Sequence, residues 1–481
     1  RTLERFEEAK TFGSLIEVPE EDAAPLKALV DELEQLARKG DVMQKPAAET
    51  LLPYVRQAWV LSQRYDSVIA NPPHMGRRGM NVELKQFAKS YFPNSKYDLF
   101  AIFMERFFSL LNVGGFNSQI NMHSWMFLSS YERLRDWLLK NTTIINLSHL
   151  GPRAFNEISG EVVQTAAWVI RKAFIENYQS TYFRLNSGDS EQKKNRLLGR
   201  GGRFESISQS LFVGIPEKPI AYWADLDTLR CFEFKKISDY AVPKQGISTC
   251  NDSLFLRYWY EVSIGDISVP ENFSNNKKWF PFLKGGSFRK WYGNIEYVLD
   301  WENSGENVHR YNKLPLSYKG APMRGKDFFF KEGIAWSAIS SGKFSGRYTP
   351  EGFAFAGKGP MLFPDSKDHL MEILGVLNSS ISMRFFEILS PTLDFTQGAV
   401  GNFPLKLGFD EKFRKNVVRA VEISKKDWDS YETSWDYRGF DFGNESPSSV
   451  KSSFLRLISK NDELVNDISS VEESINRDVI N

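Results

Sequence analysis

The stretch YDSVIANPPHMGRRGMN, residues 65–81, joins a short β-branched, apolar run to an abrupt Asn-Pro-Pro-His turn. Such a run, bounded by a proline turn, predicts a buried strand over Ser67–Ala70. Helical spacing follows over 97–115, where the Gly-Gly end is typical of a helix C-cap. FNSQINM (116–122) predicts a strand, 129–141 a helix, and 143–150 and 161–171 two more strands. The alternation indicates an open α/β sheet ending in a strand pair, with Asn71 at a carboxyl strand end, where ligands bind.

Composition limits the class of protein. The chain has 481 residues, enough for two to four domains, and a net charge of +1, so any argument for nucleic-acid binding must be local. Its two cysteines, Cys231 and Cys250, make no disulfide framework, and no Cys/His cluster predicts a metal site. Two cysteines in so long a chain favour a reducing, cytoplasmic setting, and no apolar run is long enough to span a membrane. The start at Arg1, inside a charged helix-like pattern, suggests part of a longer protein.

The pattern along the chain predicts five regions. A helical segment is expected first, then the α/β region, a polar connecting region or linker, a β-rich aromatic region, and a charged helical tail. Within the β-rich region Ser366–Leu389 has the pattern of one strong helix. The five regions are 1–64, 65–175, 176–235, 236–407 and 408–481.

The Asn-Pro-Pro turn suits one kind of chemistry. An aromatic amine such as adenine N6 is a poor nucleophile, because its lone pair is delocalised into the ring. Two carbonyl oxygens, from the Asn71 side chain and the Pro72 backbone, can accept both N–H groups and draw the nitrogen towards tetrahedral geometry. Pro72 and Pro73 make the turn rigid. In a duplex the base must first be flipped out, and the flat ring of His74 could stack on it. An ordinary Pro-Pro turn is the alternative.

The stretch from Ser67 to Phe116 resembles the amino-methyltransferase signature, Asp/Asn-Pro-Pro-aromatic, as it occurs in the PglX family of BREX phage-defence methyltransferases. Blocks around HSWMFLSSYERLR, LGPRAFNEISGEVVQTAAWVI and LGVLNSSISMRFFEIL also resemble that family, in the same order. The resemblance implies a DNA adenine-N6 methyltransferase that uses S-adenosyl-L-methionine. It implies the second half of a Rossmann-like class I methyltransferase sheet, then a mixed α+β target-recognition domain and a helical C-terminal tail. It assigns catalysis to Asn71, Pro72, Pro73 and His74, and a structural role to Asp98, Leu99 and Phe100.

Two departures from the family pattern stand out. His74 stands where the family usually has tyrosine, phenylalanine or tryptophan, and its imidazole ring offers less stacking area than those side chains. The glycine-rich cofactor loop and the acidic ribose-binding residue are not found, and NVGGF is a helix cap instead. The cofactor site is therefore expected mostly upstream of Arg1, with Asn71 at its edge. A catalytically impaired, sequence-reading DNA-binding subunit, or the methyltransferase part of a type IIG restriction–modification enzyme, stays open.

Double-stranded DNA and the other BREX subunits are the expected partners, and phage-encoded inhibitors are a further candidate. No association with a membrane is expected. Residues 236–360 hold 17 Lys/Arg against 12 Asp/Glu, with interleaved aromatics in KKWFPFLKGGSFRKWYG (277–293). A β core with a solvated lysine face is the alternative for any single residue. Ser124 and Trp125 follow a predicted strand and could border the base pocket. His123, His149, His309 and His369 lack ligand spacing and are expected to be structural. The candidate DNA contacts are Ser124, Trp125, Lys277, Lys278, Lys284, Arg289, Lys290, Arg324, Lys326, Lys343 and Arg347.

Overall fold

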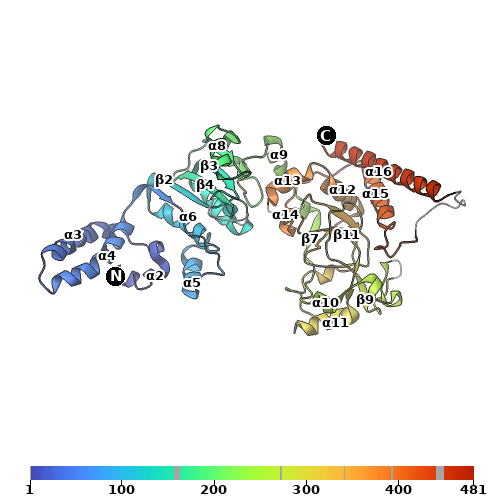
Figure 1. Ribbon diagram of the computed structural model, residues 1–481, viewed down its shortest axis with the longest axis horizontal. Helices are drawn as coiled ribbons and strands as arrows, with labels where there is room; N and C mark the ends of the chain where they lie inside the picture. Colours follow the sequence, from blue (N-terminus) through green and yellow to red (C-terminus); the bar gives the residue numbers. More distant parts are fainter. Residues whose placement is uncertain are drawn as a thin grey trace. The chain divides into compact units, whose positions relative to one another are not determined.

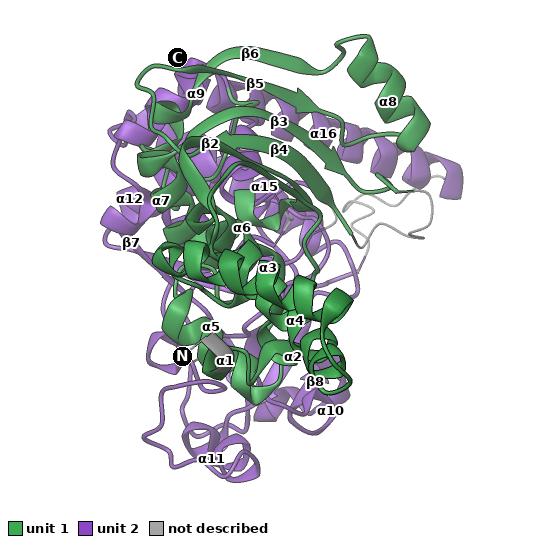
Figure 2. Ribbon diagram, turned by 90° about the vertical axis from the view of Figure 1, so that its left-hand side faces the viewer, with its two compact units in different colours: residues 1–224 green, residues 225–481 purple. Residues whose placement is uncertain are grey.

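The strands expected after residue 64 do form one mixed sheet, which belongs to the first of two compact units of the chain. The computed structural model describes residues 2–155, 163–270, 273–340, 342–391, 394–439 and 449–480. Contacts divide it into unit 1, Arg1–Ala224, and unit 2, Asp225–Asn481, coloured separately in Figure 2.

The sheet of unit 1 has the order β1-β2-β4-β3-β5-β6. β1 pairs parallel with β2, and β3 pairs parallel with β5, whereas β4 lies antiparallel between β2 and β3, and β6 is antiparallel to β5. The expected strand pair is β3 and β4, but it does not end the sheet, because β5 and β6 continue beyond β3. The strands are β1 (Tyr65–Ala70), β2 (Leu111–Met122), β3 (Thr143–Gly151), β4 (Thr165–Arg171), β5 (Gln179–Arg184) and β6 (Arg203–Ser208).

Helices precede and connect these strands. The two long N-terminal helices, α3 and α4, lie side by side as a hairpin (Figure 1) around a small apolar core. α3 ends at Lys39, directly before Gly40. α6 packs on β2 and α7 on β3. The helices are α1 (Thr2–Arg5), α2 (Ala9–Phe12), α3 (Ala23–Lys39), α4 (Gln44–Ser62), α5 (Val82–Tyr91), α6 (Leu99–Ser109), α7 (Glu132–Asn141) and α8 (Ser190–Leu198).

The segment NVGGF is not the helix cap that the sequence suggested. α6 ends at Ser109, and β2 already begins at Leu111. The pairing of β1 with β2 shifts between Tyr65, opposite Leu111, and Ser67, opposite Phe116, so residues 112–115 form a bulge. A Cβ atom on Gly115 would lie 2.9 Å from the Asp66 carbonyl oxygen, so only glycine allows this approach of two backbones. Apolar residues around the glycines continue the helical pattern, which is why periodicity misplaced the boundary.

Beyond the bulge, one face of β2 carries a buried chain of amide side chains. Asn117 donates to the Met104 carbonyl in α6 at 3.2 Å, and Gln119 donates to the Asn117 oxygen at 3.0 Å. Asn121 donates to Gln119 at 3.1 Å. Each amide thus satisfies the next, which makes burial of three polar side chains possible and ties β2 to α6.

The polar composition of residues 176–235 suggested a linker, but only part of this segment lacks regular structure. β5, α8 and β6 extend the sheet through residue 208. Asp189 caps α8 by accepting from the Gln192 backbone, while the Gln192 side chain accepts from the Asp189 N–H, a capping box that begins a helix despite polar composition. Unit 1 ends at Ala224.

A pair of histidines lies in the core at the carboxyl ends of β2 and β3. His123 Nδ1 is 2.8 Å from His149 Nε2, and His149 Nδ1 is 3.1 Å from the Tyr222 hydroxyl. His149 is 5% exposed. Burial lowers the pKa of His123 to about 4, and burial together with the neighbouring His123, Arg184 and Lys193 side chains lowers the pKa of His149 to about 3. Both rings are therefore neutral near pH 7, as expected of structural histidines.

Unit 2 consists of two four-stranded sheets with helices at its end. The sheets have the orders β13-β9-β10-β8 and β12-β11-β14-β7; the first packs in one aromatic-rich core, and the second contributes side chains both to that core and to another. The strands are β7 (Ala241–Lys244), β8 (Leu256–Tyr258), β9 (Trp279–Leu283), β10 (Tyr297–Asp300), β11 (Gly333–Trp336), β12 (Gly346–Thr349), β13 (Ala354–Phe355) and β14 (Met361–Pro364). This agrees with the short β segments expected there.

The predicted single helix over Ser366–Leu389 is two helices, because the chain turns at Ser379 after α12. The Ser379 hydroxyl donates to the Val376 carbonyl at 2.6 Å, an alternative to continuing the helix. α12 and α15 pack in the same core, with the C-terminal half of α16. The helices are α9 (Leu226–Arg230), α10 (Asp252–Phe255), α11 (Glu302–Tyr311), α12 (Lys367–Asn378), α13 (Ser382–Leu389), α14 (Gln397–Gly401), α15 (Glu411–Trp428) and α16 (Val450–Ile480).

The bulge makes a prediction about stability. Replacing Gly115 with alanine forces β1 and β2 apart, so we expect the free energy of unfolding of unit 1 to fall by about 1–3 kcal/mol. Gly214→Ala is the matched control, because a Cβ atom there meets nothing within 4 Å. Thermal or urea unfolding of both variants measures the difference, and equal losses would contradict this account of the bulge.

The histidine pair makes the stability of unit 1 depend on pH. The pKa of His149 is lowered in the folded chain from 6.5 to about 3, so below pH 6.5 the unfolded chain binds a proton that the folded chain resists. Stability should therefore fall with pH from 6.5 downwards, by about 1.4 kcal/mol per pH unit from His149 alone. His149→Gln should flatten the decline in urea titrations, whereas His369→Gln in unit 2 should keep it. A His149→Gln variant with an unchanged slope would contradict the assignment.

Candidate functional site

The Asn-Pro-Pro-His turn lies where β1 ends, as expected. Asn71 is exposed, and its side chain has no hydrogen-bond partner within the described ranges. Pro72 is buried, whereas Pro73 and His74 are exposed. The buried proline anchors the turn, so the exposed amide of Asn71 and the ring of His74 project from a rigid backbone.

The loop after the turn is fastened to the start of α6 by Asp98. This residue is the N-cap of α6, and its Oδ1 accepts from the Phe100 N–H at 3.3 Å and from the Met75 N–H at 3.1 Å. Its Oδ2 lies 3.0 Å from His74 Nδ1. A backbone bridge between Gly76 and Asp98 completes the attachment. The expected structural role of Asp98 is thus joined by a direct contact with a predicted catalytic residue.

Sequence reasoning missed this contact. An aspartate directly before an apolar helical run signals an N-cap, which accounts for Oδ1. No spacing rule connects it to His74 in an earlier loop, so Oδ2 carries no signal in the sequence.

Aromatic side chains continue from His74 into the core. The His74 ring is 6.4 Å from that of Phe100, and Phe100 is 5.8 Å from Tyr131. Burial and the nearby charge of Asp98 raise the pKa of Tyr131. This phenol is therefore neutral, and it forms an apolar wall behind the loop.

Ser124 and Trp125 differ in how far they are accessible. Ser124 is partly exposed, and it hydrogen-bonds the side chain of Tyr131. Trp125 is 0% exposed and lies 6.0 Å from Trp168 in an edge-to-face arrangement. Its ring cannot reach DNA in this conformation, because the short 3₁₀ helix at His123–Met126 directs it into the core. Trp125 therefore packs in the core and is not the DNA contact that the sequence predicted.

Several basic residues predicted to contact DNA in unit 2 are neutralised internally. β9 and its following loop carry them close to the helices of the same unit. Three form ion pairs with carboxylates: Lys284 with Asp252 at 2.8 Å, Lys290 with Glu472 at 3.0 Å, and Arg289 with Asp427. Trp291 also donates its indole N–H to Glu472, at 2.6 Å, so α16 is docked through this stretch.

Arg347 is buried and cannot contact DNA in this conformation. It is 2% exposed, and burial beside the charge of Arg289 lowers its pKa to about 10. Its guanidinium donates to the Arg289 carbonyl and the Ser337 hydroxyl, each at 3.3 Å. The sequence around Arg347, a glycine before it and a tyrosine after it, gave no sign of this burial. The prediction that Arg347 contacts DNA is therefore wrong for this conformation.

The remaining basic candidates differ in how far they are engaged. Lys277 and Lys326 donate to the backbone carbonyls of Gly265 and Leu316, and Arg324 donates to the Gln245 side chain at 2.8 Å. Lys278 and Lys343 are exposed and form no ion pair with a described residue. These two cations are the most available of the predicted set.

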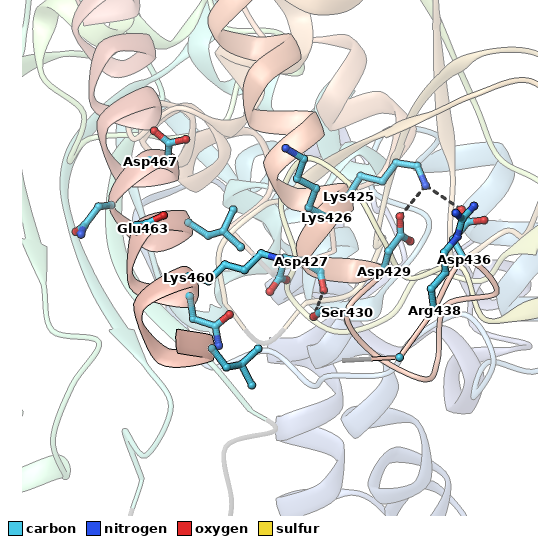
Figure 3. A pocket seen from close by; sticks show the side chains of 15 residues that line it. Lys425, Lys426, Asp427, Asp429, Ser430, Asp436, Arg438, Lys460, Glu463 and Asp467 are labelled. Atoms are coloured by element: carbon cyan, nitrogen blue, oxygen red, sulfur yellow. Dashed lines mark hydrogen bonds and ion pairs between the residues drawn. The ribbon is translucent and has the colours of Figure 1, made fainter. Parts of the chain in front are cut away.

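One hollow of unit 2 is lined by three of the predicted basic residues, and another lies nearby on the same helices. One, of about 890 Å³, is lined by Phe288, Arg289, Lys290, Lys343 and Tyr431, with Asp427 and Glu472. The other, of about 1230 Å³ between α15 and α16, has alternating charges (Figure 3). There Lys425 binds Asp429 at 2.8 Å and Asp436 at 2.9 Å. Neither presents charge of one sign.

Two kinds of site are not found in the part of the chain that the structure describes. No three His, Cys, Asp or Glu side chains converge as metal ligands there. Nor does any helix within those ranges have the length and apolar character needed to cross a bilayer.

Comparison with known proteins agrees with this architecture. Residues 16–155 match the family model of the Eco57I restriction-modification methylase. The chain is 46% identical over 482 residues to the adenine-specific methyltransferase BrxX of Escherichia coli O9:H4 (strain HS), covering 99% of this chain and 39% of that protein. It is 40% identical over 395 residues to the adenine-specific methyltransferase PglX of Lacticaseibacillus casei (strain Zhang), covering 80% and 33%.

A solved DNA complex of the type IIL restriction-modification enzyme MmeI has a similar fold. The TM-score is 0.50 at 15% identity, covering 85% of this chain and 55% of that one. This likeness confirms the predicted fold class. Residues 16–155 are therefore similar to the Eco57I restriction-modification methylase family, and along 99% of its length the chain is similar to one part of the adenine-specific methyltransferase BrxX.

Proposed function

We propose that this chain forms the target-base side of a site-specific DNA adenine-N6 methyltransferase in a BREX bacteriophage-defence system, where it marks host DNA. The observation that carries the proposal is the exposed, unpartnered Asn71 amide at the end of β1, in a loop fastened by Asp98. The names of the two relatives support adenine as the substrate. The chain spans about two fifths of the length of the first relative, so the activity is proposed for the full-length protein.

Asn71 and Pro72 would bind the target amine. The Asn71 side-chain oxygen and the Pro72 carbonyl oxygen each accept one N–H of adenine N6. Those two hydrogen bonds draw the nitrogen lone pair out of conjugation with the ring, because they favour tetrahedral geometry at nitrogen. The rigid prolines hold both acceptors in place before the base arrives, which is the preorganisation that lowers a barrier most effectively.

His74 would stack on the flipped base. Extrusion from the duplex costs a few kcal/mol, and stacking on a flat side chain returns about 1–3 kcal/mol. The ring is exposed on one side, whereas its Nδ1 side contacts Asp98. Tyr131 and Phe100 lie behind it and exclude water from the inner side of the loop.

The residues at this strand end fit one edge of an S-adenosyl-L-methionine site. The free Asn71 amide suits a neutral, polar contact. When bound, the cofactor supplies a methyl group on a positively charged sulfur, which needs no acid to depart. Of the residues predicted here, only Asn71 would border it.

Unit 2 would bind double-stranded DNA. The DNA complex of MmeI, similar in fold, supports this use of the architecture. Among the candidate cations, Lys278 lies 5.4 Å from the Trp279 ring, and Lys343 borders the hollow that contains Phe288 and Tyr431. Exposed cations beside aromatic rings suit phosphate contact combined with stacking. A cytoplasmic location, other BREX subunits and phage-encoded inhibitors as partners belong to the same proposal.

A second candidate is a sequence-reading DNA-binding subunit without catalysis, which His74 favours because its ring offers less stacking area than tyrosine. Calorimetry with S-adenosyl-L-methionine on the full-length protein separates the two. Saturable uptake supports the methyltransferase, and its absence supports the reader. A fused type IIG enzyme would in addition cleave DNA.

Substitution of Asn71 tests the proposed catalytic role. Asn71→Ala removes one acceptor, so we expect methylation of host DNA to fall by about 10²-fold or more. Asn71→Asp keeps a side-chain oxygen at the same place and should retain more activity than alanine. Methylation is measured by adenine-modification sequencing of host DNA in cells with the full-length protein and its partner subunits. Unchanged modification with Asn71→Ala would rule out the assignment.

Salt dependence tests the proposed DNA surface. Removing one lysine that binds a phosphate should reduce the steepness of log affinity against log salt by about 0.9. We expect this change for Lys278→Ala and Lys343→Ala. Lys415→Ala, whose ammonium already pairs with Glu411 at 2.8 Å, is the matched control and should keep the slope. Fluorescence anisotropy with duplex DNA at several salt concentrations measures this slope. Equal slopes for all three variants would exclude these contacts.

A further inference from the structure

Asp98 is bound more completely than a helix cap requires. Its side chain is 8% exposed, and its two oxygens have different partners. Oδ1 accepts from two backbone N–H groups, those of Met75 and Phe100, at 3.1 and 3.3 Å. Oδ2 is left for the side chain of His74, whose Nδ1 lies 3.0 Å away. The cap alone would be satisfied by Oδ1, so the second oxygen has a separate task.

The contact determines where the imidazole carries its proton. A carboxylate only accepts hydrogen bonds, so Nδ1 must donate and therefore carries the hydrogen. In the neutral ring, Nε2 is then an acceptor with a free lone pair. The His74 side chain is 54% exposed, so its remaining edge faces outwards. A carboxylate behind a histidine commonly fixes tautomer and ring orientation in this way.

We propose that Asp98 is a positioning residue for His74, which fixes the plane of the imidazole and makes its exposed edge a hydrogen-bond acceptor. The proposal rests on the proposed function, because it concerns the ring on which the flipped adenine stacks. An exposed side chain free to rotate loses entropy when a base binds, and Asp98 removes that loss in advance. The same carboxylate accepts from the Met75 N–H, so the His74 ring and the loop backbone are both held by Asp98.

This arrangement compensates for the small ring at position 74. Tyrosine, phenylalanine and tryptophan gain stacking energy from area, whereas imidazole has less area to offer. A fixed ring recovers part of that difference. The neighbouring Phe100 ring, 6.4 Å away and tilted by 50°, does not stack flat on His74, so orientation depends on the carboxylate.

Two variants of Asp98 separate positioning from capping. Asp98→Ser keeps an N-cap residue but is too short to reach His74, so it releases the ring. Asp98→Asn keeps an oxygen for the two backbone N–H groups and places an amide NH₂ opposite Nδ1, which should move the imidazole hydrogen to Nε2. Each is also made with His74→Phe, a ring without nitrogen.

Methylation kinetics with the full-length protein on unmodified host DNA measures the coupling. We expect Asp98→Ser to lower kcat/KM about tenfold with His74 present, corresponding to about 1.4 kcal/mol. In the His74→Phe background the same change should alter kcat/KM less than about twofold. An equal loss in both backgrounds would reduce Asp98 to a cap and overturn the proposal.

Imidazole ¹⁵N NMR tests the pair without requiring methyltransferase activity. With ¹⁵N-histidine labelling above neutral pH, the His74 signals are identified among the five histidines by their loss in His74→Phe. We expect the Nδ1–H tautomer in the unsubstituted protein and the Nε2–H tautomer in Asp98→Asn. An Nε2–H tautomer in the unsubstituted protein would overturn the proposal. If methylation fails while the tautomer is as expected, the proposed function fails and the Asp98–His74 pair stands.

Discussion

The parallel hydrogen bonds between β1 and β2 place Asn71 at the edge of the sheet, because Ala70 pairs with Gln119 and β1 ends there. This register follows from the bulge at residues 112–115, which lets Ser67 pair with Phe116 after Tyr65 pairs with Leu111. Without the bulge, the two strands would be offset and the Asn-Pro-Pro turn would meet different neighbours. The close approach at Gly115 brings the backbones of β1 and β2 together at the bulge, and the buried amides of β2 tie that strand to α6. The chemistry of the turn therefore depends on backbone geometry some distance from it.

Charge in unit 2 is shared between internal cohesion and any external ligand. Arg289 and Lys290 hold α15 and α16 through Asp427 and Glu472, so their positive charge is already neutralised. An excess of lysine and arginine in a region thus overstates the charge available to phosphates. The charge of Arg347 is likewise not available to a ligand, because its guanidinium is buried and donates to the Arg289 carbonyl and the Ser337 hydroxyl. The positive field at the surface of unit 2 is determined by the cations that have no internal carboxylate partner.

The sequence was sufficient for features with local causes. The alternation of elements and the turn at Asn71 follow from periodicity and backbone restriction, and the fold class they indicated is confirmed. The NVGGF bulge, the α8 capping box in a polar stretch and the break at Ser379 were missed because apolar or polar composition continued across them. Trp125 and Arg347 were misassigned since burial depends on the packing of distant segments. Pairings such as Asp98 with His74 have no signal in spacing.

The second oxygen of Asp98 also links two positions in evolution. If position 74 changes to a side chain without an N–H, Oδ2 loses its donor while remaining buried, at a cost of about 1–3 kcal/mol. No other donor to Oδ2 lies among the hydrogen bonds of the described residues. A lineage that acquires phenylalanine at position 74 keeps Oδ1 as the cap of α6 but leaves Oδ2 without its donor. The gain in stacking area at position 74 is then reduced by an unsatisfied oxygen behind the loop.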